Sequence, residues 1–252
     1  MKTLISFLEY LWMFKNTFFD RFVGIRKKPE DATFQHMLNF AQQVAAQNPL
    51  ALVDVMRLFL RPLQTELLIS AASRELHGAC QPIEALKFFA PEFFPALGTL
   101  SHYPRLPVDG FIVDLARDPV LPCPWRRNRY VDAIAYIGDG KDCGSWRQDS
   151  NHYILLWLPW GIPFVAGGNH SIAAGVLAGQ GSVVPTEVWD LSSWLALIET
   201  DGKFYFDKKT GKSICAVTDP VRAAIFETGR LMVEHSVVPM VSNVNSPLDL
   251  AA

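Results

Sequence analysis

The sequence predicts an α+β protein in which a helical N-terminal region precedes a mixed sheet with helices. Apolar residues recur at helical spacing over residues 30–76, whereas short apolar runs bounded by glycine and proline dominate the later part of the chain. Half of the 252 residues are hydrophobic and 19% are charged, which is typical of a globular chain with a sizeable core. We therefore expect a helical region over residues 1–107, an α+β domain over residues 108–240 and a loose tail over residues 241–252.

The overall composition limits the classes of function and the cellular compartment that we expect for this chain. A formal net charge of −2 argues against a strong, general nucleic-acid surface, although it is compatible with a local basic patch. The four cysteines are scattered, without the spacing of a zinc site or of a disulfide framework. We expect free thiols in a reducing cytoplasm, and no metal site.

The first 25 residues are rich in leucine and aromatic side chains. Charged residues interrupt this stretch, and its uncharged runs are too short to cross a bilayer, so we expect no transmembrane segment. The helical spacing predicts a helix that packs on the protein's own core or on a partner, with the apolar stripe Leu4, Phe7, Leu8, Leu11 and Trp12. Peripheral membrane contact beside the basic residues Arg26–Lys28 is the alternative.

Two or three helices are predicted over residues 30–76. Asn48-Pro49 ends the first of them. Helical spacing continues over Leu52–Leu60 and Leu63–Leu76, with a kink or an interruption at Pro62 because proline lacks the backbone N–H that a helix needs. One further short helix is expected at Ile83–Phe89, within a proline-rich stretch that links the two regions.

An apolar run, a glycine turn and a helix follow one another in the middle of the chain. Leu155–Val165 is almost wholly apolar, which predicts a strand buried on both faces. Gly167 and Gly168 permit a tight turn and a close approach to another group, and either Asn169 or Ser171 is the expected N-cap of the helix.

Further elements surround this turn. The helix is expected to end at Gly179, and Val183–Leu191 predicts a strand, so that the unit reads strand–helix–strand. The other predicted elements are a strand at Phe111–Leu115, helices at Val131–Ile137 and Ser192–Ile198, a hairpin of Lys203–Asp207 and Lys212–Val217, and a last helix that is capped by Thr218 or Asp219, starts at Pro220 and runs to Glu234.

The start of the central helix is a candidate anion site. A helix N-terminus presents unpaired N–H groups and the positive end of its dipole, and a glycine turn clears the approach. His170 adds a donor or titrates near neutral pH. Asp149 and His152 reach this site if they lie at the mouth of the sheet, and otherwise they belong to a polar loop. The alternative for the whole turn is a corner whose glycines serve packing alone.

The motif Gly168-Asn169-His170-Ser171 is followed by the small pair Ala173-Ala174, by Leu177-Ala178-Gly179 and by Val184-Pro185. In this order the motifs resemble the ParB/sulfiredoxin-like superfamily over roughly residues 108–195. They resemble in particular a bacterial branch of unknown function with a Gly-Gly-Asn-His-Ser signature. The resemblance implies that the helix N-terminus binds a nucleotide phosphate, with ATP or CTP and Mg²⁺ as expected ligands.

Two positions depart from the pattern of that superfamily. Ser171 stands where the superfamily has arginine, which removes one charged partner for phosphate. Arg126 and Arg129 are candidates to replace that charge, and a solvated basic helix start is the alternative for them. Asn169 stands where sulfiredoxins carry their catalytic cysteine, so we do not expect the reduction of sulfinic acids.

The expected function is nucleotide or phosphate binding, extended to phosphoryl transfer or nucleotide hydrolysis if the site is catalytic. The expected binding residues are Gly167, Gly168, Asn169, His170, Ser171, Arg126 and Arg129. His170 is also the candidate acid–base, and Glu187 and Asp190 are further candidates for a general base or for holding a metal-bound water. Two alternatives stay open: a non-catalytic interaction module that binds a partner through the N-terminal helices, and a nuclease, which needs carboxylates that converge on His170.

Overall fold

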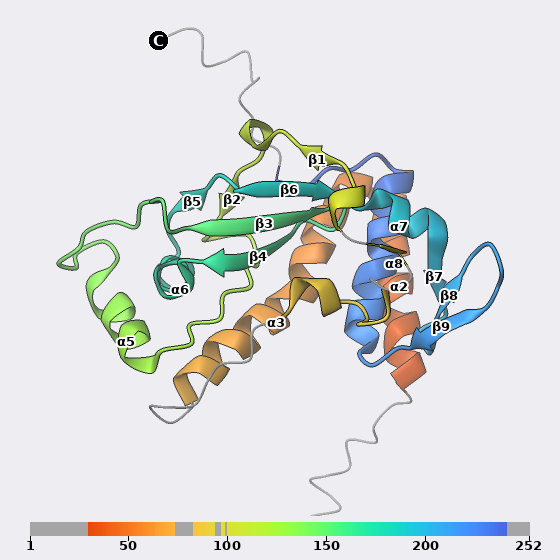
Figure 1. Cartoon of the computed structure of the whole chain (residues 1–252), viewed down its shortest axis with the longest axis horizontal. Coiled ribbons are helices and arrows are strands. Elements are labelled where there is room, and N and C mark those ends of the chain that lie inside the picture. Colours follow the sequence, from red (N-terminus) through yellow and green to blue (C-terminus); the bar gives the residue numbers. More distant parts are fainter. Residues whose placement is uncertain (1–29, 74–82, 94–96, 99, 241–252) are drawn as a thin grey trace, which may run out of the picture.

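The computed structural model describes residues 30–73, 83–93, 97–98 and 100–240. The α+β class with N-terminal helices is confirmed (Figure 1). The helix predicted within the first 25 residues and the tail predicted over residues 241–252 lie outside the described residues. No helix of the described ranges combines the length and the apolar character that crossing a bilayer requires.

Two long helices form the first part of the described chain, α2 (Glu30–Gln47) and α3 (Leu52–Ser73). The predicted break between them is confirmed: the side chain of Asn48 caps a short 3-10 helix by accepting a hydrogen bond from the backbone N–H of Leu50. Of the two alternatives at Pro62, a kink or an interruption, the interruption is wrong, because α3 continues through this residue as one helix. Buried leucines on both sides of Pro62 hold α3 against the core, which outweighs the lost backbone bond.

The main sheet has four strands in the order β1 (Arg105–Leu106), β6 (Glu187–Asp190), β3 (Tyr153–Leu158) and β4 (Ile162–Gly167). β3 and β6 are parallel, and the other neighbours are antiparallel. The single strand predicted from the apolar run is therefore a hairpin. Its turn includes Pro159 and Gly161, of which Gly161 adopts a φ of 65° that favours glycine. Residues 156–164, from the end of β3 through the turn into β4, are all buried, which concealed this turn in the hydrophobic pattern.

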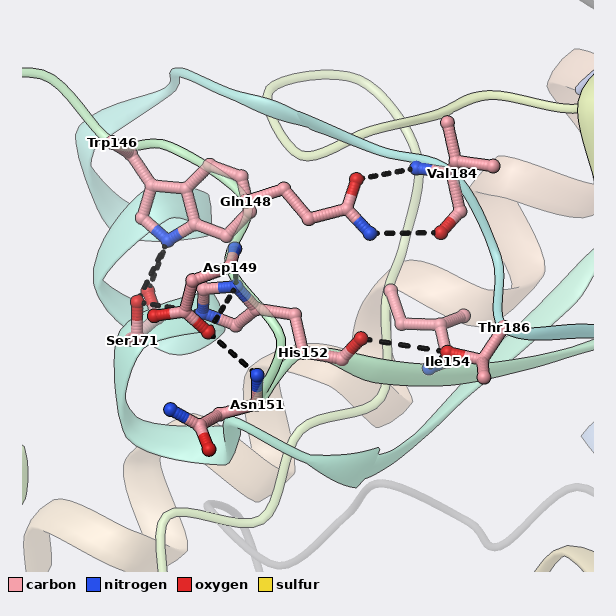
Figure 2. Close-up of polar contacts among 9 residues, drawn as sticks. All are labelled: Trp146, Gln148, Asp149, Asn151, His152, Ile154, Ser171, Val184 and Thr186. Carbon is pink, nitrogen blue, oxygen red and sulfur yellow. Dashed lines mark hydrogen bonds and ion pairs between the residues drawn. The ribbon is translucent and has the colours of Figure 1, made fainter.

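The strand predicted at Val183–Leu191 is also divided. Its first part is β5 (Ser182–Val183), which pairs with β2 (Val113–Asp114) in a separate sheet, and its last part is β6. The side-chain amide of Gln148 accepts from the N–H of Val184 at 2.9 Å and donates to its carbonyl at 3.0 Å (Figure 2). A side chain thus replaces a strand partner where the chain passes from one sheet to the other.

The remaining predicted elements occur in the predicted order, two of them shorter than expected, and two short strands, β1 and the strand Ile198–Thr200, were not predicted. Asp219 caps the last helix by accepting from the N–H of Val221 at 2.8 Å, as predicted. The strand predicted at Phe111–Leu115 comprises only the two residues of β2. The helix predicted at Ile83–Phe89 is a 3-10 helix at Ala85–Lys87. The elements are α5 (Arg127–Tyr136), α6 (Asn169–Ala178), α7 (Ser192–Leu197), β7 (Ile198–Thr200), β8 (Phe204–Asp207), β9 (Ser213–Ala216) and α8 (Pro220–Glu234).

Alternation along β3 divides the core between the two faces of the main sheet. Trp157 packs into a large cluster with buried side chains of α2, α3, α7 and α8. Ile154 and Leu156 point the other way and pack with Leu115 and with Ile172 of α6. Figure 1 shows α5 and α6 at one end of this sheet and α7 and α8 at the other. The start of β3 therefore faces the glycine turn, and its end faces α8.

Candidate functional site

The turn between β4 and α6 is built by one glycine in the left-handed region. Gly168 has a φ of 72° and is itself the N-cap residue of α6, which begins at Asn169. The prediction that Asn169 or Ser171 caps the helix is therefore wrong, because both side chains bond elsewhere. The predicted end of the helix is confirmed, since Gly179 is the C-cap residue with a φ of 65°.

The two glycines of the turn allow a close approach of the segment that precedes β3. A Cβ atom on Gly168 would lie 2.4 Å from Cδ2 of His152, and one on Gly167 would lie 2.7 Å from the carbonyl oxygen of Asn151. The close approach that the sequence predicts is thus present, and the approaching group is another part of the same chain. Larger side chains at these positions would push the β3 segment away from α6.

Asn169 and His170 fasten the turn to the segment before α5. The side-chain oxygen of Asn169 accepts from the backbone N–H of Cys123 at 2.7 Å. Nε2 of His170 accepts from the backbone N–H of Arg126 at 3.1 Å. These bonds bring the backbone of Arg126 to the turn. That its guanidinium belongs to a phosphate site there stays a prediction. The sequence gives no signal for the bond to Cys123, because its donor is a backbone N–H.

The surface beside His170 is aromatic and basic. The ring of Trp125, which is 47% exposed, lies 5.9 Å from the His170 ring between centroids. The guanidinium of Arg126 lies 4.3 Å from the centre of the Trp125 ring, a cation–π distance. Burial lowers the pKa of His170, and the positive charge of Arg129 lowers it further. His170 is therefore neutral at pH 7, and because Nε2 accepts, its proton is on Nδ1.

A second contact cluster forms where Ser171 meets the segment before β3 (Figure 2). Nε2 of His152 lies 3.0 Å from Oγ of Ser171, and Nδ1 of His152 lies 3.2 Å from a carboxylate oxygen of Asp149. The indole N–H of Trp146 donates to both the carbonyl and the hydroxyl oxygen of Ser171, at 2.8 and 3.0 Å. His152 thus reaches the turn, which was one of the two alternatives open from the sequence, whereas Asp149 contacts His152 and Asn151 within its own loop.

The order Ser171, His152 and Asp149 resembles a nucleophile triad in its residue types alone. The backbone N–H of Asp149 donates to Nδ1 of His152 at 2.7 Å, so that nitrogen carries no proton. Nε2 then carries the proton and donates a hydrogen bond to Oγ of Ser171. A general base would instead have to accept a hydrogen bond from that hydroxyl. Ser171 receives donors from both His152 and Trp146, and the cluster holds β3 and α6 together.

A model of a family of unknown function, DUF6710, matches residues 21–238. The chain belongs to this family. No curated protein and no solved structure matches the chain.

Glu187, which the sequence also assigns to the site, makes its contacts away from the turn. Its carboxylate pairs with Arg105 at 3.3 Å and accepts from the indole N–H of Trp189 at 2.9 Å. Within the described ranges of the DUF6710 chain, no cluster of three or more histidine, cysteine or acidic side chains is placed to hold a metal ion. A role of Glu187 as general base stays a prediction.

Lowering the pH is expected to destabilise the DUF6710 chain through His152, which is 4% exposed. Burial lowers the pKa of its imidazole below 6.5, against the opposing charge of Asp149. Below about pH 6.5 the unfolded chain binds a proton that the folded chain does not, so the free energy of unfolding falls in this range and is fully regained above it. Protonation would also put a proton on Nδ1, where the N–H of Asp149 now donates.

Urea unfolding at about pH 7.5 and about pH 5.5 measures this contribution. His152→Asn is expected to lose less stability between the two pH values than the wild type. The same substitution at the exposed His36 is the control and should retain the wild-type loss. An equal pH-dependent loss in the wild type and in His152→Asn would contradict the assignment.

Proposed function

We propose that the chain binds a phosphate-bearing ligand, and specifically a nucleotide, at the basic surface beside the start of α6. The observation that carries this proposal is that Arg126 and Arg129 are both exposed. Neither forms an ion pair with a carboxylate of the described residues. Two arginines that face water without a counter-charge suit a bidentate contact with phosphate oxygens.

The start of α6 adds to the positive potential there. The first N–H groups of a ten-residue helix have no acceptor within the helix, and its dipole is positive at this end. Neutral His170 supplies an Nδ1–H donor beside the arginines, since its Nε2 is occupied by the backbone of Arg126. The exposed ring of Trp125 offers an apolar surface for a base, which distinguishes a nucleotide from inorganic phosphate.

The chemistry that follows binding belongs to the same proposal. ATP or CTP with Mg²⁺ are the ligands implied by the resemblance to the ParB/sulfiredoxin-like superfamily, and phosphoryl transfer or hydrolysis is the reaction class. His170 is the expected acid–base because it is neutral and its Nδ1 carries a proton. The glycines act on this site indirectly, since they let the β3 segment pack under the turn.

Thermal-shift measurements with ATP, CTP and inorganic phosphate, with and without Mg²⁺, test the binding. A ligand at about a hundredfold above its dissociation constant stabilises the folded chain by about 2.7 kcal/mol. We expect a nucleotide to give this shift with the wild type and not with Arg126→Ser/Arg129→Ser. The double substitution keeps the backbone N–H of Arg126 that holds His170, so it removes charge and leaves the turn intact.

The matched control removes two positive charges elsewhere. Lys208 and Lys209 are exposed in the turn between β8 and β9, and Lys208→Ser/Lys209→Ser should respond to the nucleotide as the wild type does. An equal response of the arginine variant, or no response of the wild type to any of the three ligands, would overturn the proposal. If inorganic phosphate gave the same thermal shift as the nucleotides, the proposed contact between Trp125 and the base would be wrong.

One observation favours the interaction module as a second candidate function. Leu58 and Ile69 of α3 are 56% and 61% exposed, on a helix from the region to which the sequence assigns partner binding. Large apolar side chains in that position suit contact with another protein surface. Under this function, Leu58→Asp/Ile69→Asp abolishes partner binding, and Arg126→Ser/Arg129→Ser leaves it unchanged.

A further inference from the structure

A cavity of about 220 Å³ lies at the end of the main sheet opposite the glycine turn. Its walls come from the last residues of β3 and β6, Leu158 and Asp190, and from the last turn of α8 with the segment that follows it. β3 and β6 are parallel and paired at these two residues. The crevice beyond the carboxyl ends of parallel strands is where α/β sheets commonly hold small ligands.

The floor of the cavity is apolar and closely packed. Leu158, Met232 and Val237 line it and are at most 5% exposed, and Phe111 adds an aromatic ring that is 8% exposed. Val233, at 43% exposed, stands at the mouth. A pocket with a buried apolar floor and an open rim favours the burial of an apolar group from a ligand.

The segment that closes one side of the cavity is held in place from several directions. The N–H of Val237 donates to the carbonyl of Met232 at 2.8 Å, and the N–H of Ile112 donates to the carbonyl of Met240 at 2.9 Å. Pro239 fits against Gly161, where a Cβ atom would lie 2.7 Å from its ring. Non-glycine residues with positive φ, such as Met240 at 59°, persist only where the surroundings fix them. The cavity is therefore formed before any ligand enters.

Asp190 is the charged side chain in the wall of this apolar cavity. Its Oδ1 accepts from both the backbone N–H and the hydroxyl of Ser192, at 2.9 and 2.6 Å. Its Oδ2 has no hydrogen-bond partner among the residues that the structure describes. One carboxylate oxygen is thus fixed by the protein, and the other is left for a donor that enters the cavity.

We propose that this cavity binds a small molecule with an apolar body and a protonated amine, the amine donating to Oδ2 of Asp190. The volume is below the range of about 300–1,000 Å³ for drug-sized ligands, so it admits one aromatic ring or a short alkyl chain. A cationic donor is favoured over a neutral one because charge-assisted hydrogen bonds are the stronger. The site shares no residue with the turn at α6, and the proposal does not depend on nucleotide binding.

Benzylamine and benzyl alcohol are suitable probes, because they share a ring and differ in the charged group. Titrations followed by amide ¹⁵N–¹H correlation spectra should show saturable shifts at Met232, Val233 and Val237 with the amine. Asp190→Asn, which keeps an oxygen for Ser192, should weaken binding of the amine by at least about tenfold and leave binding of the alcohol nearly unchanged. The same spectra report whether the variant is folded.

A blocking variant and its matched control complete the experiment. Val233→Trp places a large side chain at the mouth of the cavity and should abolish binding of both probes. Val131→Trp makes the same change at an exposed position on α5 and should bind as the wild type does. Equal affinity of Asp190→Asn for the amine, shifts confined to other residues, or no saturable binding by the wild type would overturn the proposal.

Discussion

Arg57→Ala is expected to lower the free energy of unfolding by about 3–5 kcal/mol, the cost of leaving a buried charge without its partner. The carboxylate of Asp118 is fully buried, and Nε and Nη2 of Arg57 lie 3.0 and 2.9 Å from its Oδ1. Arg117, more than half exposed and 3.4 Å away, is a weak substitute. The pair joins α3 to the loop after β2, so its loss also loosens the N-terminal helices from the sheet region. Urea unfolding at neutral pH measures the change.

Two further substitutions separate the buried pair from the other contacts of Arg57. Asp54 also pairs with Arg57, at 2.6 Å, but its side chain is 73% exposed, so Asp54→Asn should change stability by less than about 1 kcal/mol. Asp118→Asn combined with Arg57→Ala should be less destabilised than Arg57→Ala alone, because it removes the unpaired buried charge. A loss below about 1 kcal/mol in Arg57→Ala would show that the pair contributes little.

Gly229→Ala is expected to destabilise the protein by about 2–4 kcal/mol, although alanine is the better helix former. A Cβ atom on Gly229 in α8 would lie 2.1 Å from Nε1 and 2.4 Å from Cδ1 of Trp160. Trp160 is fully buried in the turn between β3 and β4, and its N–H donates to the carbonyl of Phe226 at 3.1 Å. The gain of about 1 kcal/mol in helix propensity does not offset displacing this ring and breaking its hydrogen bond.

The glycine prediction has a control and a rescue. Gly110 has no atom within 4 Å of its Cβ position, so Gly110→Ala should leave thermal and urea unfolding nearly unchanged. Trp160→Phe in the Gly229→Ala background should recover part of the loss, because the smaller ring leaves room for the methyl group. If Gly229→Ala unfolds at the same urea concentration as the wild type, α8 does not pack against Trp160 as described.

Local signals in the sequence were sufficient for several elements. Asp219 followed by Pro220 predicts the start of α8, and the structure confirms both positions. Gly179 ends α6 as predicted, in the left-handed conformation that glycine adopts readily, whereas the N-cap is Gly168 and not Asn169 or Ser171. These features depend on residues within one or two turns of each other, so the chain itself contains the information that fixes them.

Long-range contacts decided the rest. The apolar run Leu155–Val165 is a hairpin because both strands find partners and buried surroundings in the sheet. Gly168 has no Cβ atom and so leaves room for the ring of His152. His170 accepts a hydrogen bond from the backbone N–H of Arg126, 44 positions away along the chain. By itself, the sequence determined the α+β class and the position of the glycine turn. Only the tertiary structure decided which groups meet there, because hydrogen bonds and close packing between distant segments leave no periodic pattern in either one.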